Sequence, residues 1–247
     1  MKEFRGKLSI LVPAHNEEPH IYGNIREIQR VFNEIGCRYE LIIIDDGSKD
    51  KTYENARKAA KGYANITVKA MRRNQGKGRA LKYGFRFAKG DLVAFLDADL
   101  DLHPEQIQNL FKILNKNGAD VVIGSKRHPE SKLNYPWHRK IISNIYFLLI
   151  KLMFSLPIRD TQTGIKLFKY EVLKKVFPKV LIKRYAFDLE LLTNAHHLRY
   201  KIVEAPVTLN YQRFMGRIGL KAIYCTGLDT LAIFYRMYIL KYYNGKK

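Results

Sequence analysis

The stretch LVAFLDAD, residues 92–99, ends a run of five apolar residues with two carboxylates, Asp97 and Asp99. The run follows the breaker pair Gly90-Asp91, and this pattern predicts a short, fully buried strand. Where a chain leaves a sheet, the alternation of side chains relaxes, so neighbouring carboxylates can converge. Two or three acidic oxygens suit a hard divalent cation such as Mg²⁺ or Mn²⁺. We therefore predict metal ligands at Asp97, Asp99 and Asp101, although an acidic turn with a helix cap before Pro104 would use the same residue types.

The first half of the chain alternates strand and helix patterns that are separated by short connections. This rhythm predicts an α/β fold, in which a mainly parallel, Rossmann-like sheet is flanked by helices. In such sheets ligands bind beyond the carboxyl ends of the strands. The predicted strands are Leu8–Val12, Leu41–Ile44, Ile66–Ala70, Leu92–Leu96 and Val121–Ile123, and the predicted helices are Ile21–Ile35, Thr52–Ala60, Arg79–Ala88 and Glu105–Leu114.

Acidic and polar residues follow three of these strands. Because the carboxyl ends of parallel strands meet at one edge of a sheet, we expect the three tips to share one site. Neither G-x-x-x-x-G-K-[ST] nor a G-x-G-x-x-G after the first strand is present. A short glycine turn, Gly76-Lys77-Gly78, opens a helix where the backbone and Lys77 can approach a base or a phosphate. A carboxylate-held metal remains the main device for binding a nucleotide diphosphate. The three tips are Pro13-Ala14-His15-Asn16-Glu17-Glu18, Asp45-Asp46-Gly47-Ser48 and Asp97-Ala98-Asp99.

After Gly124 the rhythm breaks into helical stretches, polar loops and one further strand candidate, Lys201–Leu209. We predict one continuous domain over residues 1–247, in which residues 124–247 complete the site that residues 1–123 begin. Residues 124–247 hold 23 Lys and Arg against 7 Asp and Glu, so they carry most of the net charge of +21. This asymmetry indicates an anionic partner, either nucleic acid, an acidic membrane surface or a phosphorylated substrate, or else a solvated basic face.

Two C-terminal segments have the pattern of amphipathic helices that contact a membrane without crossing it. Basic and polar residues interrupt both Ile141–Ile158 and Ile218–Tyr243, and neither holds 18 consecutive apolar residues. Helices of this kind lie in a membrane interface, although ordinary core helices can show the same pattern. With only Cys37 and Cys225, and no secretory signal in the first residues, we expect a reducing cytoplasmic setting.

Four motifs within residues 13–99 resemble those of family 2 glycosyltransferases, which have the GT-A fold. Three later motifs are similar to the polyprenyl-phosphate branch of that family, which contains dolichyl-phosphate mannose and glucose synthases, and the glucose type is the most similar. The resemblance extends to about Lys221. The first four motifs are the tips Pro13-Ala14-His15-Asn16-Glu17-Glu18, Asp45-Asp46-Gly47-Ser48-Lys49-Asp50 and Asp97-Ala98-Asp99, with Asn74-Gln75-Gly76-Lys77-Gly78 between them. The later three are Gly124-Ser125-Lys126-Arg127, Arg159-Asp160-Thr161-Gln162-Thr163-Gly164-Ile165-Lys166 and Tyr185-Ala186-Phe187-Asp188-Leu189-Glu190.

The resemblance implies roles for individual residues of these motifs. His15 stands where relatives often have Tyr, and Asp101 stands where mannose synthases often have Gln. Arg213 matches an Arg that neutralises the charge of the diphosphate. The expected catalytic residues are Asp99, Asp160 and Arg213. The residues expected to bind the UDP- or GDP-linked sugar are Pro13, His15, Glu17, Asp46, Lys77, Asp97, Ala98 and Asp99.

A lipid phosphate acceptor fits the charge of the second half. A sugar hydroxyl needs a base to remove its proton, whereas a phosphate monoester is largely ionised near neutral pH and needs cations instead. The resemblance implies a metal-dependent, inverting transfer from a nucleotide sugar, with UDP-glucose favoured, to dolichyl or polyprenyl phosphate. We expect the enzyme to be cytoplasmic and peripheral at the inner face of the membrane. The cations expected to bind the acceptor phosphate are Lys126, Arg127, Arg159, Lys166 and Arg213.

Three other functions compete with lipid glycosylation. A glycosyltransferase that extends a saccharide would use Asp188 or Glu190 as its general base. A nucleic-acid-binding module is disfavoured, because its aromatic and basic sheet motifs are missing and acidic strand tips repel phosphates in the absence of a metal, so we expect no nucleic-acid partner. A sugar nucleotidyltransferase shares the sheet and the acidic pair, but its usual glycine-rich loop does not follow the first strand.

Overall fold

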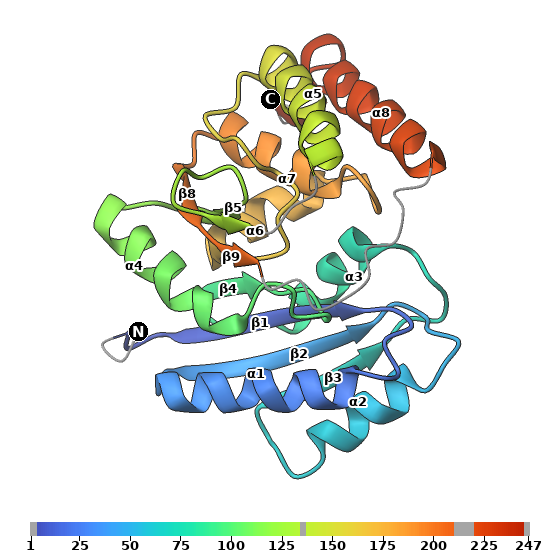
Figure 1. Cartoon of the computed structure of the whole chain (residues 1–247), viewed down its shortest axis with the longest axis vertical. Helices are drawn as coiled ribbons and strands as arrows, with labels where there is room; N and C mark the ends of the chain where they lie inside the picture. Colours follow the sequence, from blue (N-terminus) through green and yellow to red (C-terminus); the bar gives the residue numbers. More distant parts are fainter. Residues whose placement is uncertain (1–3, 134–136, 210–219, 245–247) are drawn as a thin grey trace.

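The computed structural model describes residues 4–133, 137–209 and 220–244, and a sheet of seven strands runs through it (Figure 1). The strand order is β3-β2-β1-β4-β7-β5-β8, and all neighbours are parallel except the two pairs that involve β7. The prediction of an α/β fold with a mainly parallel sheet is therefore confirmed. The strands are β1 (Lys7–Ala14), β2 (Arg38–Asp45), β3 (Ile66–Ala70), β4 (Leu92–Phe95), β5 (Val121–Ser125), β7 (Lys166–Lys169) and β8 (Ile202–Pro206).

Helix α1 (Ile21–Ile35) packs one apolar face against this sheet, because its apolar residues recur at intervals of three and four. The side chains of Ile21, Ile25 and Ile28 are almost completely buried, and each contributes about 1.5–3 kcal/mol by leaving water. The helix ends at Gly36, where φ is 71°. Glycine reaches this left-handed conformation without strain, so its N–H can close the last turn.

Helices cover both faces of the sheet (Figure 1). On one face lie α1, α2 (Thr52–Ala60) and α4 (Ile107–Asn117), and on the other lie α3 (Lys77–Gly84), α6 (Tyr170–Val176) and α7 (Phe187–His197). Short 3₁₀ turns occur at Phe85–Phe87, Pro104–Gln106, Phe177–Lys179 and Tyr242–Asn244, and a π-helical turn spans Tyr235–Ile239. Strands β6 (Lys132–Leu133) and β9 (Thr208–Leu209) form a small separate parallel sheet.

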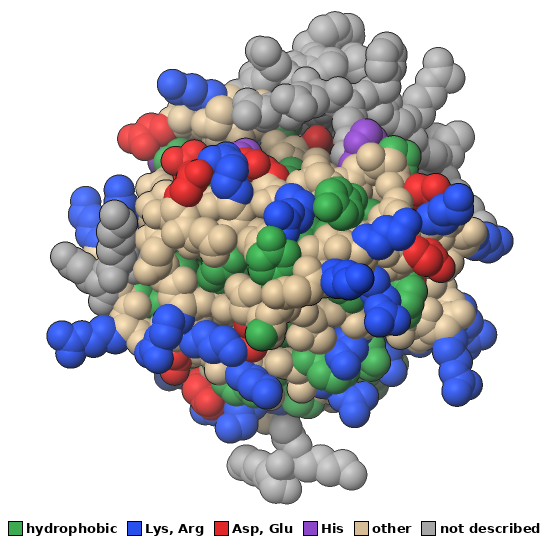
Figure 2. Space-filling view, turned by 90° about the horizontal axis from the view of Figure 1, so that it is seen from below, with side chains coloured by type: hydrophobic (Ala, Val, Ile, Leu, Met, Phe, Trp, Pro, Cys, Tyr) green, Lys and Arg blue, Asp and Glu red, His purple; other side chains and the backbone are tan. Residues whose placement is uncertain are grey.

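Two further helices, α5 (Trp137–Phe154) and α8 (Leu220–Phe234), lie side by side at the end of the molecule that holds the C-terminus (Figure 1). The rings of Phe154 and Phe234 meet between them, with centroids 6.3 Å apart. The opposite end shows dispersed Lys and Arg side chains with only small, separate apolar areas (Figure 2). Of the residues that the structure describes, no helix is both long and apolar enough to cross a bilayer.

The predicted elements of the first half are present, and α1 and α2 have the predicted bounds. The single predicted strand Lys201–Leu209 is wrong, because β8 and β9 join different sheets. Between them the N–H of Val207 donates to the hydroxyl of Ser131 instead of to a strand. Strand β7 had no predicted counterpart. Its four residues become a strand only because β4 and β5 offer hydrogen-bonding edges on both sides.

Candidate active site

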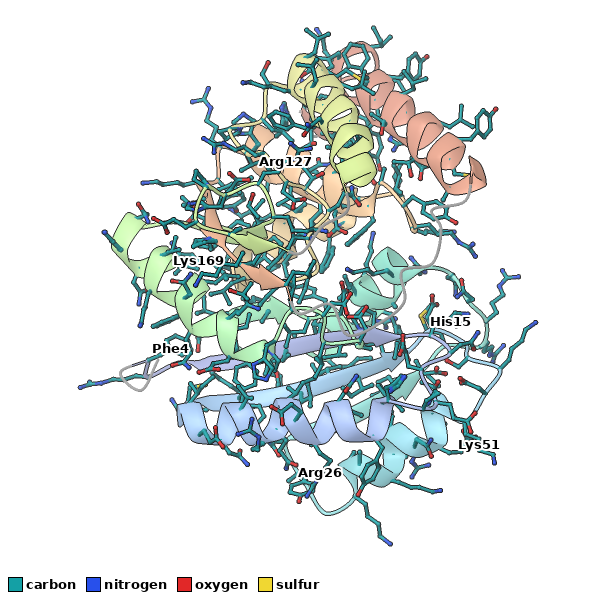
Figure 3. The ribbon with its side chains drawn as sticks, viewed as in Figure 1. Phe4, His15, Arg26, Lys51, Arg127 and Lys169 are labelled. Carbon is teal, nitrogen blue, oxygen red and sulfur yellow. The ribbon has the colours of Figure 1, made fainter. Side chains whose placement is uncertain are left out.

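The carboxyl ends of β1, β2 and β4 form the edge of one open cleft that holds about 220 Å³. These strands are neighbours in register, with Ala14 beside Asp45 and Leu11 beside Phe95, so the polar tips leave the sheet together. His15 lies at the end of β1 in Figure 3. The cleft brings together all eight residues predicted to bind a nucleotide sugar. Its lining is Pro13, Ala14, His15, Glu17, Asp46, Asn74, Gly76, Lys77, Asp97, Ala98 and Asp99.

An ion pair between Lys77 and Asp97 lies in this cleft. Lys77 is the first residue of α3, and its Nζ is 2.5 Å from Oδ1 of Asp97, which follows β4. Burial alone would raise the pKa of Asp97, but the ammonium group of Lys77 outweighs it and holds that pKa below its usual value. Burial likewise opposes the charged form of Lys77, yet Asp97 outweighs it and raises the pKa of Lys77. Asp97 is therefore ionised, and its charge is compensated by Lys77.

Asp99 lies in an excess of negative charge. Burial contributes most to raising the pKa of Asp99. The negative charges of Asp97, Asp101 and Glu17 add to it, and the pKa reaches about 6. Directly after Asp99, Leu100 adopts a φ of 56°, a left-handed conformation that non-glycine residues rarely take. Strain of this kind persists where the surrounding structure over-determines it, often at functional sites. A divalent cation would offset the repulsion between Asp99 and its acidic neighbours, so the donor set fits Mg²⁺ or Mn²⁺.

Of the three predicted metal ligands, Asp97 and Asp99 line the cleft and Asp101 does not. Within residues 4–133, 137–209 and 220–244, no group of three or more His, Cys, Asp or Glu side chains is arranged to hold a metal ion. Asp101 instead donates its backbone N–H to Oδ1 of Asp99, at 3.1 Å, and so shapes the turn. The structure thus does not support Asp101 as a third ligand. Two carboxylates leave open coordination positions, which phosphate oxygens can fill.

Asp46 holds the glycine turn against the sheet. Its two carboxylate oxygens accept the N–H groups of Gln75 and Gly76, at 2.8 and 2.7 Å. The N–H of Gly78 donates to the carbonyl oxygen of Lys183. The expectation that the backbone of this turn meets a phosphate is therefore wrong for Gly76 and Gly78, because protein groups already use their N–H groups. Only the side chain of Lys77 extends from the turn towards Asp97.

Comparison with known sequences identifies the family. Residues 9–177 match the sequence model of "Glycosyl transferase family 2". The chain belongs to glycosyl transferase family 2. A dolichyl-phosphate beta-glucosyltransferase from Trichomonas vaginalis is 35% identical, and the match covers 93% of this chain and 74% of the length of that protein. The dolichyl-phosphate beta-glucosyltransferase from Homo sapiens is 31% identical over 85% of this chain and 68% of its own. The glycosyltransferase is thus related to enzymes of the dolichyl-phosphate sugar synthase type, as its motifs predicted.

Solved structures share the fold of this glycosyltransferase. Glucosyl-3-phosphoglycerate synthase from Mycobacterium tuberculosis, solved with Mn²⁺, uridine diphosphate and phosphoglyceric acid, matches with a TM-score of 0.71 at 20% identity, over 95% of this chain and 79% of that one. A mannosyltransferase from Pyrobaculum calidifontis, solved with GDP-Man and Mn²⁺, matches with a TM-score of 0.66 at 20% identity, over 100% and 66%. The fold is therefore GT-A, as predicted.

Lys166 is not the surface cation that the sequence predicted. It begins β7 opposite Phe95 of β4, so the antiparallel strand carries its side chain into the interior, where it is 1% exposed. Its Nζ lies 2.7 Å from Oδ1 of Asp188 and also donates to the carbonyl oxygen of Thr163. The prediction that Lys166 binds the acceptor phosphate is wrong, because the ammonium group is buried in an ion pair.

Asp160 organises the loop that leads into β7. Its carboxylate accepts the N–H groups of Lys126 and Gln162, each at 3.0 Å, and the hydroxyl of Thr163 at 2.6 Å. The same loop places Gly164 against Asp97, where an added Cβ would collide with the carboxylate. Sequence reasoning missed Gly164, although it lies within the later motif. The predicted catalytic role of Asp160 stays a prediction.

The other described cations predicted to bind the acceptor, Lys126, Arg127 and Arg159, do not line the cleft. The charge of Lys126 acts on Asp97 and lowers its pKa, after the larger contribution of Lys77. Arg127, labelled below α5 in Figure 3, donates to Oδ1 of Asn144 at 2.8 Å. The side chain of Arg159 is exposed. Arg213 lies outside the described residues.

The two acids that would act as general base for a saccharide acceptor, Asp188 and Glu190, are buried and bonded to other groups of the protein. Glu190 is 0% exposed, and Asp188 is paired with Lys166. The carboxylate of Glu190 accepts two backbone N–H groups, from Leu181 and Ile182. The alternative in which Glu190 removes a proton from an acceptor is therefore wrong. Its carboxylate also accepts hydrogen bonds from the guanidinium group of Arg236 and the hydroxyl of Tyr243.

Proposed function

We propose that this glycosyltransferase moves glucose from UDP-glucose to dolichyl or polyprenyl phosphate, with inversion, at a membrane surface. The observation that carries the proposal is the single cleft in which the acidic tips of β1, β2 and β4 meet Lys77. The relatives that match over most of the chain are dolichyl-phosphate beta-glucosyltransferases, and their name supports both the sugar and the acceptor.

Asp97 and Asp99 are the residues that would hold Mg²⁺ or Mn²⁺. The cation would supply positive charge to the departing diphosphate. Both side chains line the same cleft, and Gly164 leaves room for that of Asp97. Among the described residues, Lys77 is a cation that can contact the diphosphate, because its side chain lies in the cleft beside Asp97.

A phosphate acceptor agrees with the charges on the acceptor side. The phosphate oxygen is already an anion and attacks the anomeric carbon without giving up a proton. Lys126, Arg127 and Arg159 are the described cations proposed to guide it. The burial of Glu190 and the pairing of Asp188 with Lys166 support this acceptor over a sugar hydroxyl.

We propose that α5, α8 and the turns that follow α8 contact the membrane. Eleven of the fourteen large exposed apolar side chains among the described residues belong to this end of the molecule. Leu152 of α5 is 82% exposed, and Leu231 of α8 is 59% exposed. The exposed basic residues Lys151 and Lys241 lie in the same segments, and basic residues near an anionic leaflet contribute on the order of 1 kcal/mol each. We propose peripheral attachment at the inner, cytoplasmic face.

Transfer of labelled glucose from UDP-glucose tests the proposal. We expect label in the organic phase only when a polyprenyl phosphate and Mg²⁺ or Mn²⁺ are added, and none with the Asp97→Ala, Asp99→Ala double variant. Parallel reactions with UDP-N-acetylglucosamine and GDP-mannose determine the sugar. Label on a water-soluble glycan, without any lipid, would refute the lipid acceptor and restore the saccharide alternative.

A further inference from the structure

We propose that Lys77 is a built-in substitute for the metal ion: it neutralises Asp97 before any ligand binds and moves to the nucleotide diphosphate when metal and nucleotide bind together. This inference rests on the proposed function, because it assumes a cation at Asp97 and Asp99. It adds a second role to Lys77, which controls when the cation binds as well as contacting the nucleotide.

The geometry of Asp97 makes the two cations compete. The Nζ of Lys77 lies 2.5 Å from Oδ1. On the other side, Oδ2 faces the backbone of Gly164, so closely that a Cβ there would collide with it. The oxygen that faces the cleft is therefore the one that Lys77 occupies. A metal ion that binds Asp97 from the cleft has to displace this ammonium group.

The ammonium group of Lys77 can move although its backbone is held in place, because the side chain is long. The flanking glycines fix its backbone, since Gly76 donates to Asp46 and Gly78 donates to Lys183. A lysine ammonium group on four methylenes has many rotamers. The pair is also not sealed in protein, because the side chains of Lys77 and Asp97 are 33% and 39% exposed. The ammonium group can therefore swing within the cleft while α3 stays in place.

The displaced ammonium group finds a partner only when the nucleotide is present. Besides Asp97, the carboxylates of Asp188 and Asp99 attract Lys77, but Asp188 is already paired with Lys166 inside the protein, and Asp99 would hold the metal ion. Metal alone would leave Lys77 without a compensating anion, whereas metal and diphosphate together supply one. Binding of the two ligands is therefore coupled, and each raises the affinity of the protein for the other.

Binding measurements with Lys77→Met test this exchange without any transfer reaction. We expect Mn²⁺ alone to bind the variant about tenfold more tightly than the wild type, because its competitor is gone. We expect uridine diphosphate, at saturating Mn²⁺, to bind about tenfold more weakly, because the diphosphate has lost its ammonium partner. These changes lie within the range of coupling factors usual for linked ligands, about 5- to 150-fold. Titration calorimetry and the paramagnetic resonance of free Mn²⁺ measure both affinities.

Two further variants and one control sharpen the comparison. Lys77→Arg keeps the charge and should retain weak binding of Mn²⁺ alone, whereas Lys77→Gln should behave like Lys77→Met and provides a second neutral variant should the first fail to fold. Lys116→Met removes an exposed charge from α4 and should change neither affinity. Unchanged or weaker Mn²⁺ binding by both neutral variants would overturn the inference. A wild type that binds no Mn²⁺ even with uridine diphosphate would instead refute the metal site of the proposed function.

Discussion

Replacing Glu190 by glutamine tests whether this acid stabilises the fold or acts in catalysis. The carboxylate of Glu190 is fully buried. One oxygen accepts the N–H groups of Leu181 and Ile182, at 2.9 and 2.7 Å. The other accepts Arg236 and Tyr243, at 2.9 and 2.5 Å. Every contact is therefore made by a donor, and an amide NH₂ group has to face donors whichever way it turns.

The cost follows from this geometry. If the NH₂ group faces the backbone, two buried N–H groups lose their acceptor, at about 1–3 kcal/mol each. Arg236, whose side chain is 18% exposed, also loses its counter-charge, although partial contact with water reduces that cost. We expect Glu190→Gln to lower the free energy of unfolding by about 3–5 kcal/mol. For a chain of this size the melting temperature should fall by roughly 10 °C.

Thermal unfolding followed by circular dichroism measures the loss, and sugar transfer at 20 °C measures what the folded fraction still does. We expect the folded variant to retain most of its activity. Glu171→Gln is the matched control, because that acid is exposed and its pair with Lys174 is long, at 3.7 Å, so the melting temperature should hardly change. An unchanged melting temperature together with abolished transfer would refute the structural role and make Glu190 the base.

Three further outcomes are expected. Gly164→Ala should weaken binding of UDP-glucose with Mn²⁺ by tenfold or more, since its Cβ collides with the carboxylate of Asp97, and calorimetry measures the affinity. The same affinity should fall about tenfold between pH 7 and pH 5. The reason is that the pKa of Asp99 is about 6, so a proton increasingly occupies this carboxylate as the pH falls below that value and has to leave before the metal binds. The Leu152→Glu, Leu231→Glu double variant should lose flotation with anionic liposomes at low salt, because both exposed leucines would otherwise enter the lipid.

Each outcome has a control or a contradicting result. Gly23→Ala meets open space on α1 and should leave nucleotide affinity unchanged, so equal losses in both glycine variants would contradict the steric argument. A flat pH profile would contradict the assignment of Asp99 as a metal ligand, since UDP-glucose itself does not titrate in that range. Tyr22→Glu alters an exposed apolar residue on α1, and flotation should survive it. Flotation of the double leucine variant would exclude α5 and α8 as the attachment face.

The sequence alone determined the strands of the first half and the location of the site. Apolar spacing is a local property, repeated every two residues in a strand and every three or four in a helix, so α1 and α2 could be predicted to the residue. The convergence of the tips of β1, β2 and β4 also followed, because parallel strands must end on the same edge. Eight cleft residues could therefore be named before any coordinates were known.

Only the tertiary structure decided which charges are free to act. Lys166 and Glu190 are as polar in sequence as any surface residue, but β7 inserts antiparallel beside β4 and carries Lys166 inside. The C-terminal turns bring Arg236 and Tyr243 onto Glu190 across about fifty positions of chain. The pairing of Lys77 with Asp97 depends likewise on where α3 lies relative to β4. The partner of a charge is set by strand register and helix packing between distant segments, and these contacts leave no periodic pattern in the sequence.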